Sequence, residues 1–235
     1  QGKFEETWFN DPRPGYADSA NPRATYAAMV THMDKNVGKV MNLLKDLEID
    51  EHTLLIFTSD NGAQGEFGGA GGEFFEFFNP TAGLRGRKGS MYEGGLRVPL
   101  VARWPGKIEP GMVNHNLSIY FPDIMPTFAE IAETNVPEDI DGISFLPSLI
   151  GEKRAGHPQN SHEYLYWEYG TGNSMSQAVR MGKWKAVRSN RTDDIELYDL
   201  IADPGENIDV ALQNKSIIQK IDSILMNSRE EPYPQ

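Results

Sequence analysis

The clearest pattern of hydrophobic positions lies between Arg23 and Leu47. Apolar side chains recur there every three or four residues, which is the spacing of one helix face, at Tyr26, Val30, Met33, Val37, Val40, Met41, Leu44 and Leu47. The run from Thr53 to Thr58 is short and apolar, typical of a strand that helices bury on both faces. A helix followed by a buried strand predicts an α/β sheet.

Glycine and proline change the pattern after that strand. Glycines are frequent between Gly62 and Gly95 and predict a long loop, which contains the aromatic cluster Phe74-Phe75-Glu76-Phe77-Phe78. This cluster either offers flat faces to a sugar or packs to anchor its own segment. Residues 96–104 predict a second strand, which Pro99 breaks or confines to a sheet edge.

A polar stretch, Gly151–Ser161, divides the chain, so we expect one part at residues 1–150 and a small subdomain at residues 151–235. The first part ends with a predicted helix that starts at Pro122 or Pro126. The sequence of the second part predicts three strand segments at hairpin spacing, namely Tyr164–Tyr169, Gln177–Arg188 with a turn at Met181-Gly182-Lys183, and Ile195–Leu200. It also predicts a final amphipathic helix, whose apolar residues are Ile217, Ile218, Ile221, Ile224 and Leu225. The fold class is therefore α/β, with helices beside a mixed sheet and then a small antiparallel sheet with a C-terminal helix.

Composition narrows the possible partners. The chain has 235 residues, 39% of them hydrophobic, so it can bury a core. A formal charge of -12 opposes binding to nucleic acid or to an anionic membrane, and no apolar run is long enough to span a bilayer. The absence of cysteine excludes a disulfide, a thiolate metal site and a thiol nucleophile within these residues. Because the chain as a whole is acidic, any anion that it binds must be held by a local cluster of cations.

Asp60 and Asn61 come directly after the predicted strand, where the ligand crevice of an α/β sheet lies. A carboxylate and an amide oxygen suit Ca²⁺ or Mg²⁺, whereas zinc prefers imidazole or thiolate. The alternative is that Asp60-Asn61-Gly62 is only a turn, since these are common turn residues.

A second candidate site is the basic stretch that follows the glycine-rich loop. Four cations, Arg85, Arg87, Lys88 and Arg97, lie within thirteen residues and alternate with glycines. Arginine can grip two oxygens of a tetrahedral anion, and lysine supplies a compact charge where negative charge develops. The alternative is a solvated basic loop that pairs with Glu93 and its neighbours. The five scattered histidines form no ligand pair at helical spacing, so none is assigned to a metal.

The stretches TLLIFTSDNG (53–62) and LRGRKGSMYEGGLRVPLVARWPG (84–106) together resemble two signature segments of the type I, formylglycine-dependent sulfatases. The helix from Tyr26, the segments Asp123–Thr127 and Asp141–Ser144, and the C-terminal hairpins are similar to the same family. The resemblance implies an alkaline phosphatase-like fold and covers most of the chain from Tyr26 onward. It implies a sulfuric ester hydrolase that acts on a sulfate ester, with a sulfated carbohydrate as the expected substrate.

The resemblance also implies roles for individual residues. Asp60 and Asn61 would be two ligands of a Ca²⁺ or Mg²⁺ ion. Lys88 would contact a sulfate oxygen and act in catalysis, and Arg85 would help to bind the substrate. Arg87 and Arg97 would support the anion-binding loop.

One element of the family pattern is missing from these residues. The family builds its formylglycine nucleophile from Cys or Ser in a C-x-P-x-R or S-x-P-x-R motif, and the chain contains neither. We therefore expect the chain to be the C-terminal part of a sulfatase, inactive alone, with the nucleophile in an N-terminal half. A sheet cut in half exposes an edge and an apolar face, so we expect association with that half or with a second copy.

Two other functions stay open from the residues alone. The first is a phosphate-ester hydrolase of the same superfamily, although its two-zinc members generally have histidine where Asn61 stands. The second is a non-catalytic remnant that binds a sulfate or a glycan through the basic loop. Family resemblance suggests a periplasmic, secreted or lysosomal location.

Overall fold

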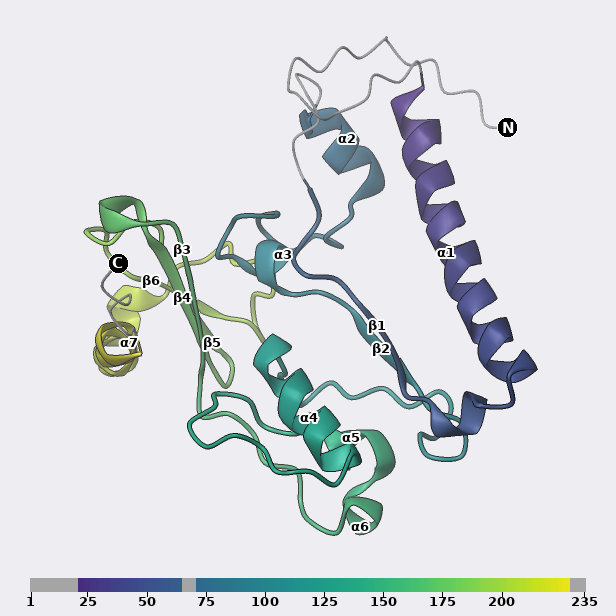
Figure 1. The fold of residues 1–235 in the computed structure, drawn as a ribbon. Helices are drawn as coiled ribbons and strands as arrows, with labels where there is room; N and C mark the ends of the chain where they lie inside the picture. The colour runs from purple at the N-terminus through teal and green to yellow at the C-terminus, as the bar shows by residue number, and fades with distance from the viewer. Residues whose placement is uncertain (1–20, 65–70, 229–235) are drawn as a thin grey trace. The chain divides into compact units, whose positions relative to one another are not determined.

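The computed structural model describes residues 21–64 and 71–228 of the chain (Figure 1). It forms two compact units, one of residues 1–53 and 58–99 and one of residues 54–57 and 100–235. The division at residues 150 and 151 that the polar stretch suggests stays a prediction. The fold is α/β, with a small antiparallel sheet and a C-terminal helix, as the sequence predicts.

The first unit begins with the long helix α1, Pro22–Asp46, which confirms the predicted helix. Pro22 lies in its first turn, where a missing N–H costs no hydrogen bond. The short helix α2, Gly71–Phe78, contains the phenylalanine cluster, so the prediction of one continuous loop was wrong there. Its end packs on α1, because the rings of Phe78 and Tyr26 lie 4.8 Å apart and the Arg23 guanidinium lies 4.4 Å from the centre of Phe77.

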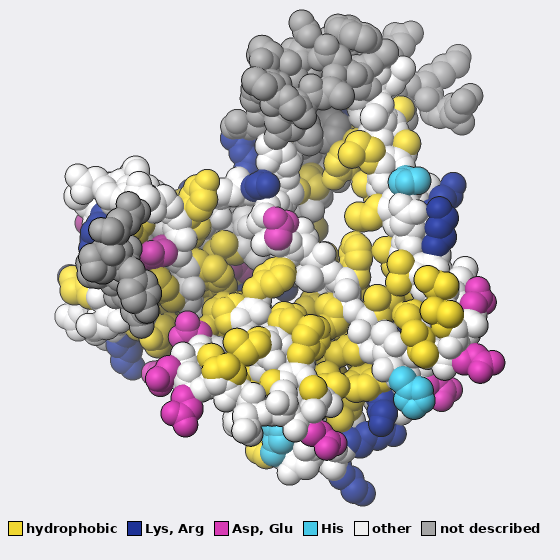
Figure 2. All heavy atoms as spheres, in the orientation of Figure 1, with side chains coloured by type: hydrophobic (Ala, Val, Ile, Leu, Met, Phe, Trp, Pro, Cys, Tyr) yellow, Lys and Arg dark blue, Asp and Glu magenta, His cyan; other side chains and the backbone are white. Residues whose placement is uncertain are grey.

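One face of α1 carries large apolar side chains that the described residues leave exposed. None of the helix side chains is buried, and Met29, Met33 and Val40 are 65%, 47% and 47% exposed. Figure 2 shows hydrophobic side chains along this helix. An apolar stripe of this length is typical of a helix that covers further protein.

The strands β1, Leu55–Thr58, and β2, Leu100–Arg103, pair in a two-stranded sheet. The second strand begins after Pro99, since proline has no N–H for the ladder. The expectation that the first strand is buried on both faces was wrong for the described residues, because Phe57 is exposed and the rest of the strand is half-buried. Two strands alone leave sheet faces that only further elements could cover.

The middle of the second unit is built around the buried carboxylate of Asp123. This residue ends the 3-10 helix η3, Phe121–Asp123, and the helix α4 follows as Ile124–Ile131, within the range expected from the two prolines. The Asp123 side chain is fully buried and accepts hydrogen bonds from the backbone N–H groups of Tyr120 at 2.9 Å and Ile143 at 2.8 Å. His162 Nε2 lies 2.8 Å from the same carboxylate. We assign the imidazole as the donor of this bond and the carboxylate oxygen, which also accepts from Ile143, as the acceptor.

This cluster joins three segments that are distant in sequence. Thr127, also fully buried, donates to the carbonyl of Asp123 and accepts from the N–H of Phe145. The segment around Ile143 leads into the helices α5, Leu146–Ile150, and α6, Glu152–Ala155. The bonds of this cluster join a carboxylate, a hydroxyl and an imidazole to one another and to the backbone, so polar groups, and not apolar packing alone, hold these segments together.

The chain then forms a four-stranded antiparallel sheet in the order β3-β4-β5-β6. Its strands are β3 (Leu165–Tyr169), β4 (Ser176–Met181), β5 (Trp184–Arg188) and β6 (Glu196–Asp199). All three predicted strand segments are confirmed. The predicted turn joins β4 to β5, where Gly182 adopts a positive φ of 59° that favours glycine.

The final helix, α7 (Lys215–Asn227), covers one face of this sheet, as predicted. Its buried residues Ile221 and Leu225 pack against Val179, Ala186 and Leu197, one from each of three neighbouring strands. Strand periodicity places these three side chains on the same face. They form the hydrophobic core of the C-terminal region.

Candidate functional site

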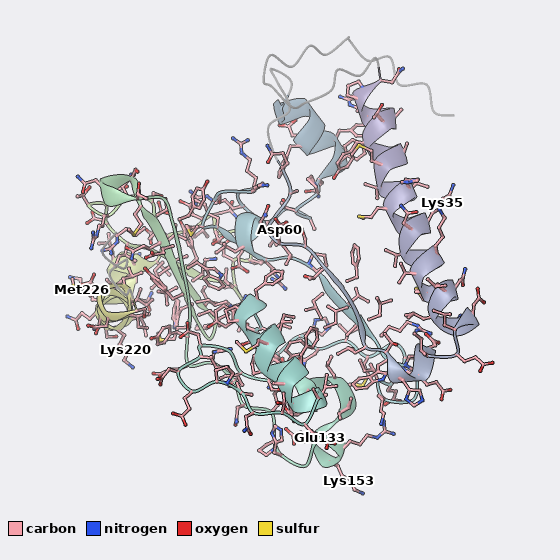
Figure 3. All side chains as sticks on the ribbon, viewed as in Figure 1. Lys35, Asp60, Glu133, Lys153, Lys220 and Met226 are labelled. Atoms are coloured by element: carbon pink, nitrogen blue, oxygen red, sulfur yellow. The ribbon has the colours of Figure 1, made fainter. Side chains whose placement is uncertain are left out.

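The candidate site lies entirely in the first unit, where the chain leaves β1. Asp60 and Asn61 follow the strand directly, and Figure 3 places Asp60 beyond its end, beside the short helix α3, Glu93–Leu96. Two backbone hydrogen bonds join the next residues to the basic stretch. Gly62 donates to the carbonyl of Gly95 at 2.9 Å, and Lys88 donates to the carbonyl of Ala63 at 3.0 Å. The structure therefore brings together the two segments that the sequence singled out.

Glycines make this close approach possible. A Cβ atom on Gly62 would overlap the backbone carbonyl of Gly94. A Cβ on Gly94 would lie 2.5 to 2.8 Å from the carbonyl oxygens of Leu84, Arg85 and Gly86. Real Cβ atoms do not come so close to backbone, so only glycine lets these segments stack directly on one another.

The cations of the basic stretch have different surroundings. Lys88 is exposed, and within the described residues its ammonium has no hydrogen-bond or ion-pair partner. The guanidinium of Arg85 lies 3.8 Å from the centre of the Tyr92 ring and donates to the Tyr92 hydroxyl at 3.0 Å. Arg97 lies 4.0 Å from the carboxylate of Glu93, which is buried. Lys88 is the cation that these contacts leave available to an anion.

The side chains of Asp60 and Asn61 fit a hard cation but do not complete its coordination. Asp60 is exposed, Asn61 is half-buried, and neither side chain has a hydrogen-bond partner among the described residues. Their oxygens suit Ca²⁺ or Mg²⁺, yet Ca²⁺ takes six to eight ligands. Within the described ranges, no group of three or more His, Asp or Glu side chains could hold a metal ion. Further ligands would have to come from outside these residues.

Two other groups of residues do not contribute to this site within the first unit. His115 is an exposed side chain of the second unit, and Phe77 and Phe78 of α2 pack on α1. Sequence reasoning missed Tyr92, which holds Arg85. Its only signal was that it is the single aromatic residue of the stretch 84–97.

Two family models match the chain. One, described as "Sulfatase", matches residues 3–134, and the other, "N-sulphoglucosamine sulphohydrolase, C-terminal", matches residues 86–231. Together they cover both candidate segments and the small antiparallel sheet.

Curated proteins and solved structures that resemble the chain are also sulfatases. The chain is 30% identical over 233 residues to N-acetylgalactosamine-6-O-sulfatase of Bacteroides thetaiotaomicron, covering 91% of the chain and 43% of that protein. It is 34% identical to N-acetylgalactosamine-6-sulfatase of Canis lupus familiaris, covering 79% of the chain and 33% of that protein. A structure solved in complex with its substrate D-glucosamine-2-N,6-O-disulfate matches with a TM-score of 0.66 and 26% identity, over 86% of the chain and 39% of that structure. The chain thus spans less than half the length of these relatives.

Proposed function

The chain belongs to the sulfatase family, and we propose that it is the part of a sulfuric ester hydrolase that helps to hold the metal ion and the sulfate group. The observation that carries this proposal is the pair of backbone hydrogen bonds that fix Asn61-Gly62-Ala63 against Lys88 and Gly95. They join the backbones of the two segments, which supports the proposal that the oxygens of Asp60 and Asn61 and the Lys88 ammonium act at one site. A phosphate-ester hydrolase is less well supported, since the matching family model is that of sulfatases and Asn61 is not an imidazole.

Each proposed role follows from the chemistry of the side chain. Asp60 and Asn61 would supply two oxygen ligands to a Ca²⁺ or Mg²⁺ ion. Such an ion, when bound, polarises sulfate oxygens and lowers the pKa of an attacking hydroxyl. Lys88 would donate to a sulfate oxygen and stabilise the negative charge that develops as the ester bond breaks. Arg85 would bind the substrate at the rim of the loop.

The nucleophile would come from outside these residues. None of the 235 positions is cysteine, and the S-x-P-x-R pattern does not occur. We propose that an N-terminal part of the same enzyme supplies the formylglycine and the remaining metal ligands, so that the chain alone is inactive. The apolar face of α1 supports this, because Met29, Met33 and Val40 are exposed in the described chain and need a cover.

The proposed substrate is a sulfated carbohydrate. The relatives reported above are named for N-acetylgalactosamine-6-sulfate, and the matching structure holds a disulfated glucosamine. The structure contains no helix, among the residues it describes, with the length and apolarity to cross a membrane. A periplasmic, secreted or lysosomal location is proposed from the family alone.

The experiment that tests the function uses the complete enzyme and measures sulfate release from N-acetylgalactosamine-6-sulfate. Lys88→Ala should lower kcat by about 100-fold or more, because one well-placed electrostatic group contributes that much in other enzymes. The matched control is Lys153→Ala, which removes an exposed lysine of α6. If the enzyme releases no sulfate, or if Lys88→Ala behaves like Lys153→Ala, the proposal is wrong.

The metal site needs a readout that does not depend on activity. Saturating Ca²⁺ should raise the thermal midpoint of the complete enzyme, since a ligand at 100 times its Kd adds about 2.7 kcal/mol of stability. Asp60→Ala should abolish most of this shift. Asp46→Ala, which removes an exposed carboxylate at the end of α1, should retain it. Equal shifts in both variants would exclude Asp60 as a ligand.

A further inference from the structure

The feature that suggests a further role is the contact between Arg85 and Tyr92. The guanidinium lies over the ring at 3.8 Å from its centre, and one of its N–H groups donates to the ring hydroxyl at 3.0 Å. A cation over an aromatic face is attracted to its quadrupole, and the hydrogen bond fixes the direction of the planar group. An exposed arginine normally samples many rotamers, so this double contact keeps Arg85 in one orientation.

Tyr92 is itself well anchored. Its backbone N–H donates to the Ser90 hydroxyl at 3.1 Å, and a Cβ atom on Gly86 would lie 3.1 Å from the Tyr92 Cβ. The N–H of Gly94, two residues after Tyr92, donates to the carbonyl of Arg85 at 2.7 Å, so the backbone of Arg85 is bonded to the segment that carries Tyr92. Both partners of the contact are therefore held by the same tight loop.

The positive charge of residues 84–97 is larger than the single negative charge of one sulfate ester. Residues 84–97 contain four cations, Arg85, Arg87, Lys88 and Arg97, and one acid, Glu93, so the local net charge is 4 − 1 = +3 in a chain of net charge -12. A sulfate monoester carries a single negative charge, and a bound divalent cation would add further positive charge. This local excess suits a ligand with more than one anionic group.

The spacing of Lys88 and Arg85 allows both to act on one ligand. They are three positions apart in the sequence, so their Cα atoms are at most about 11 Å apart. Both side chains are exposed, and each is long. Lys88 can thus contact the sulfate that is removed while Arg85 contacts another anionic group of the same saccharide.

We propose that Arg85, held by Tyr92, is a specificity-determining residue that selects substrates with a second anionic group near the scissile sulfate. The second group is an oxyanion, either another sulfate or a carboxylate, because the arginine fork binds two oxygens of such a group. Tyr92 is a positioning residue, since it acts through Arg85. This inference rests on the proposed function and deepens it by naming a class of polyanionic saccharide.

The test compares two substrates of the complete enzyme that differ in one anionic group, D-glucosamine-2-N,6-O-disulfate and D-glucosamine-6-O-sulfate. The measured quantity is the ratio of their kcat/KM values for release of the 6-sulfate. Arg85→Gln should lower this ratio by about tenfold, since a hydrogen bond to a charged group contributes about 1.5 kcal/mol or more. Tyr92→Leu should lower the ratio in the same direction, and Tyr92→Phe, which keeps the ring, should restore most of it.

Arg87→Gln is the matched control, because it removes the same charge from the same loop and leaves both Arg85 and Tyr92 in the chain. If Arg87→Gln lowers the ratio as much as Arg85→Gln does, the preference comes from diffuse charge and the inference is wrong. It is also wrong if Arg85→Gln leaves the ratio unchanged, or if Tyr92→Phe and Tyr92→Leu are equally impaired. Failure of the wild-type enzyme to release sulfate from any ester would instead refute the proposed function.

Discussion

Removing the buried carboxylate of Asp123 should destabilise the protein more than any surface substitution. Asp123→Ala would leave three donors without a partner, namely the N–H groups of Tyr120 and Ile143 and the Nε2–H of His162. Each unsatisfied buried donor costs about 1–3 kcal/mol, but the sum is not additive because water can enter the space. We therefore expect these donors together to cost about 3 kcal/mol or more.

That loss is a large part of the stability of a whole domain, which is about 5–15 kcal/mol. Asp123→Asn is therefore the more practical variant. It keeps the size of the side chain and one acceptor oxygen, while its NH₂ group faces a donor. We expect a loss of about 2 kcal/mol, from one lost bond and one donor facing another.

The assay is urea unfolding of the complete enzyme, combined with hydrogen exchange of the Ile143 amide. Asp123→Asn should lower the unfolding midpoint and speed exchange at Ile143 relative to wild type. Glu138→Ala, an exposed acid in the neighbouring connection, serves as the control. The reasoning fails if the Asp123 variants shift the midpoint no further than this control does.

Three further predictions concern single groups. The hydrogen bond to Glu130 raises the pKa of His157. The pair therefore stabilises the fold fully below the ordinary histidine pKa, and this stabilisation is lost as the pH rises through the raised pKa of His157. In an NMR titration, Glu130→Gln should return the pKa of His157 toward its ordinary value. Burial, followed by the charge of nearby carboxylates, raises the pKa of Tyr120 to about 12. The tyrosine of the unfolded chain therefore ionises first, and the stability of the fold should fall from pH about 10 upward. Tyr120→Phe should remove this fall in stability, and a spectrophotometric titration of wild type and variant should identify the late-ionising tyrosine as Tyr120. Gly62→Ala should cost about 2 kcal/mol or more, whereas Gly38→Ala in α1, whose Cβ would meet nothing within 4 Å, should add about 0.8 kcal/mol in thermal unfolding.

The elements with a regular hydrophobic period were predictable from the sequence. The 3.6-residue period of α1 gave its ends to within about a residue, and the hairpin of β4 and β5 was visible from its central glycine. The helix α2 was missed because it is short and begins with two glycines inside a glycine-rich stretch, which favours a loop. Its packing on Tyr26 and Arg23 supplies stabilisation that local propensity does not indicate.

The sequence allowed us to predict which residue types form the candidate site, but not which contacts bring them together. Asp60 and Lys88 could be singled out from their neighbours in the sequence, whereas the backbone bonds that bring their segments together depend on glycine contacts visible only in three dimensions. The same holds for Asp123 and His162, which are 39 residues apart and meet only in the folded chain. Pairs so distant in sequence leave no periodic signal.

The hydrogen bond from Gly62 to Gly95 also bears on the chemical lifetime of the site. An Asn-Gly pair ages when the glycine nitrogen attacks the asparagine side-chain carbonyl, releases ammonia and forms a cyclic imide that water opens to aspartate or isoaspartate. In the folded chain that nitrogen donates to a carbonyl at 2.9 Å and lies in a space too tight for a Cβ atom, so it is not free to attack. We predict that Asn61 resists deamidation in the native enzyme and loses ammonia rapidly once unfolded, and peptide mapping after parallel incubations would show equal rates if this is wrong. The contact that shapes the site would then also preserve the amide oxygen proposed to bind the metal.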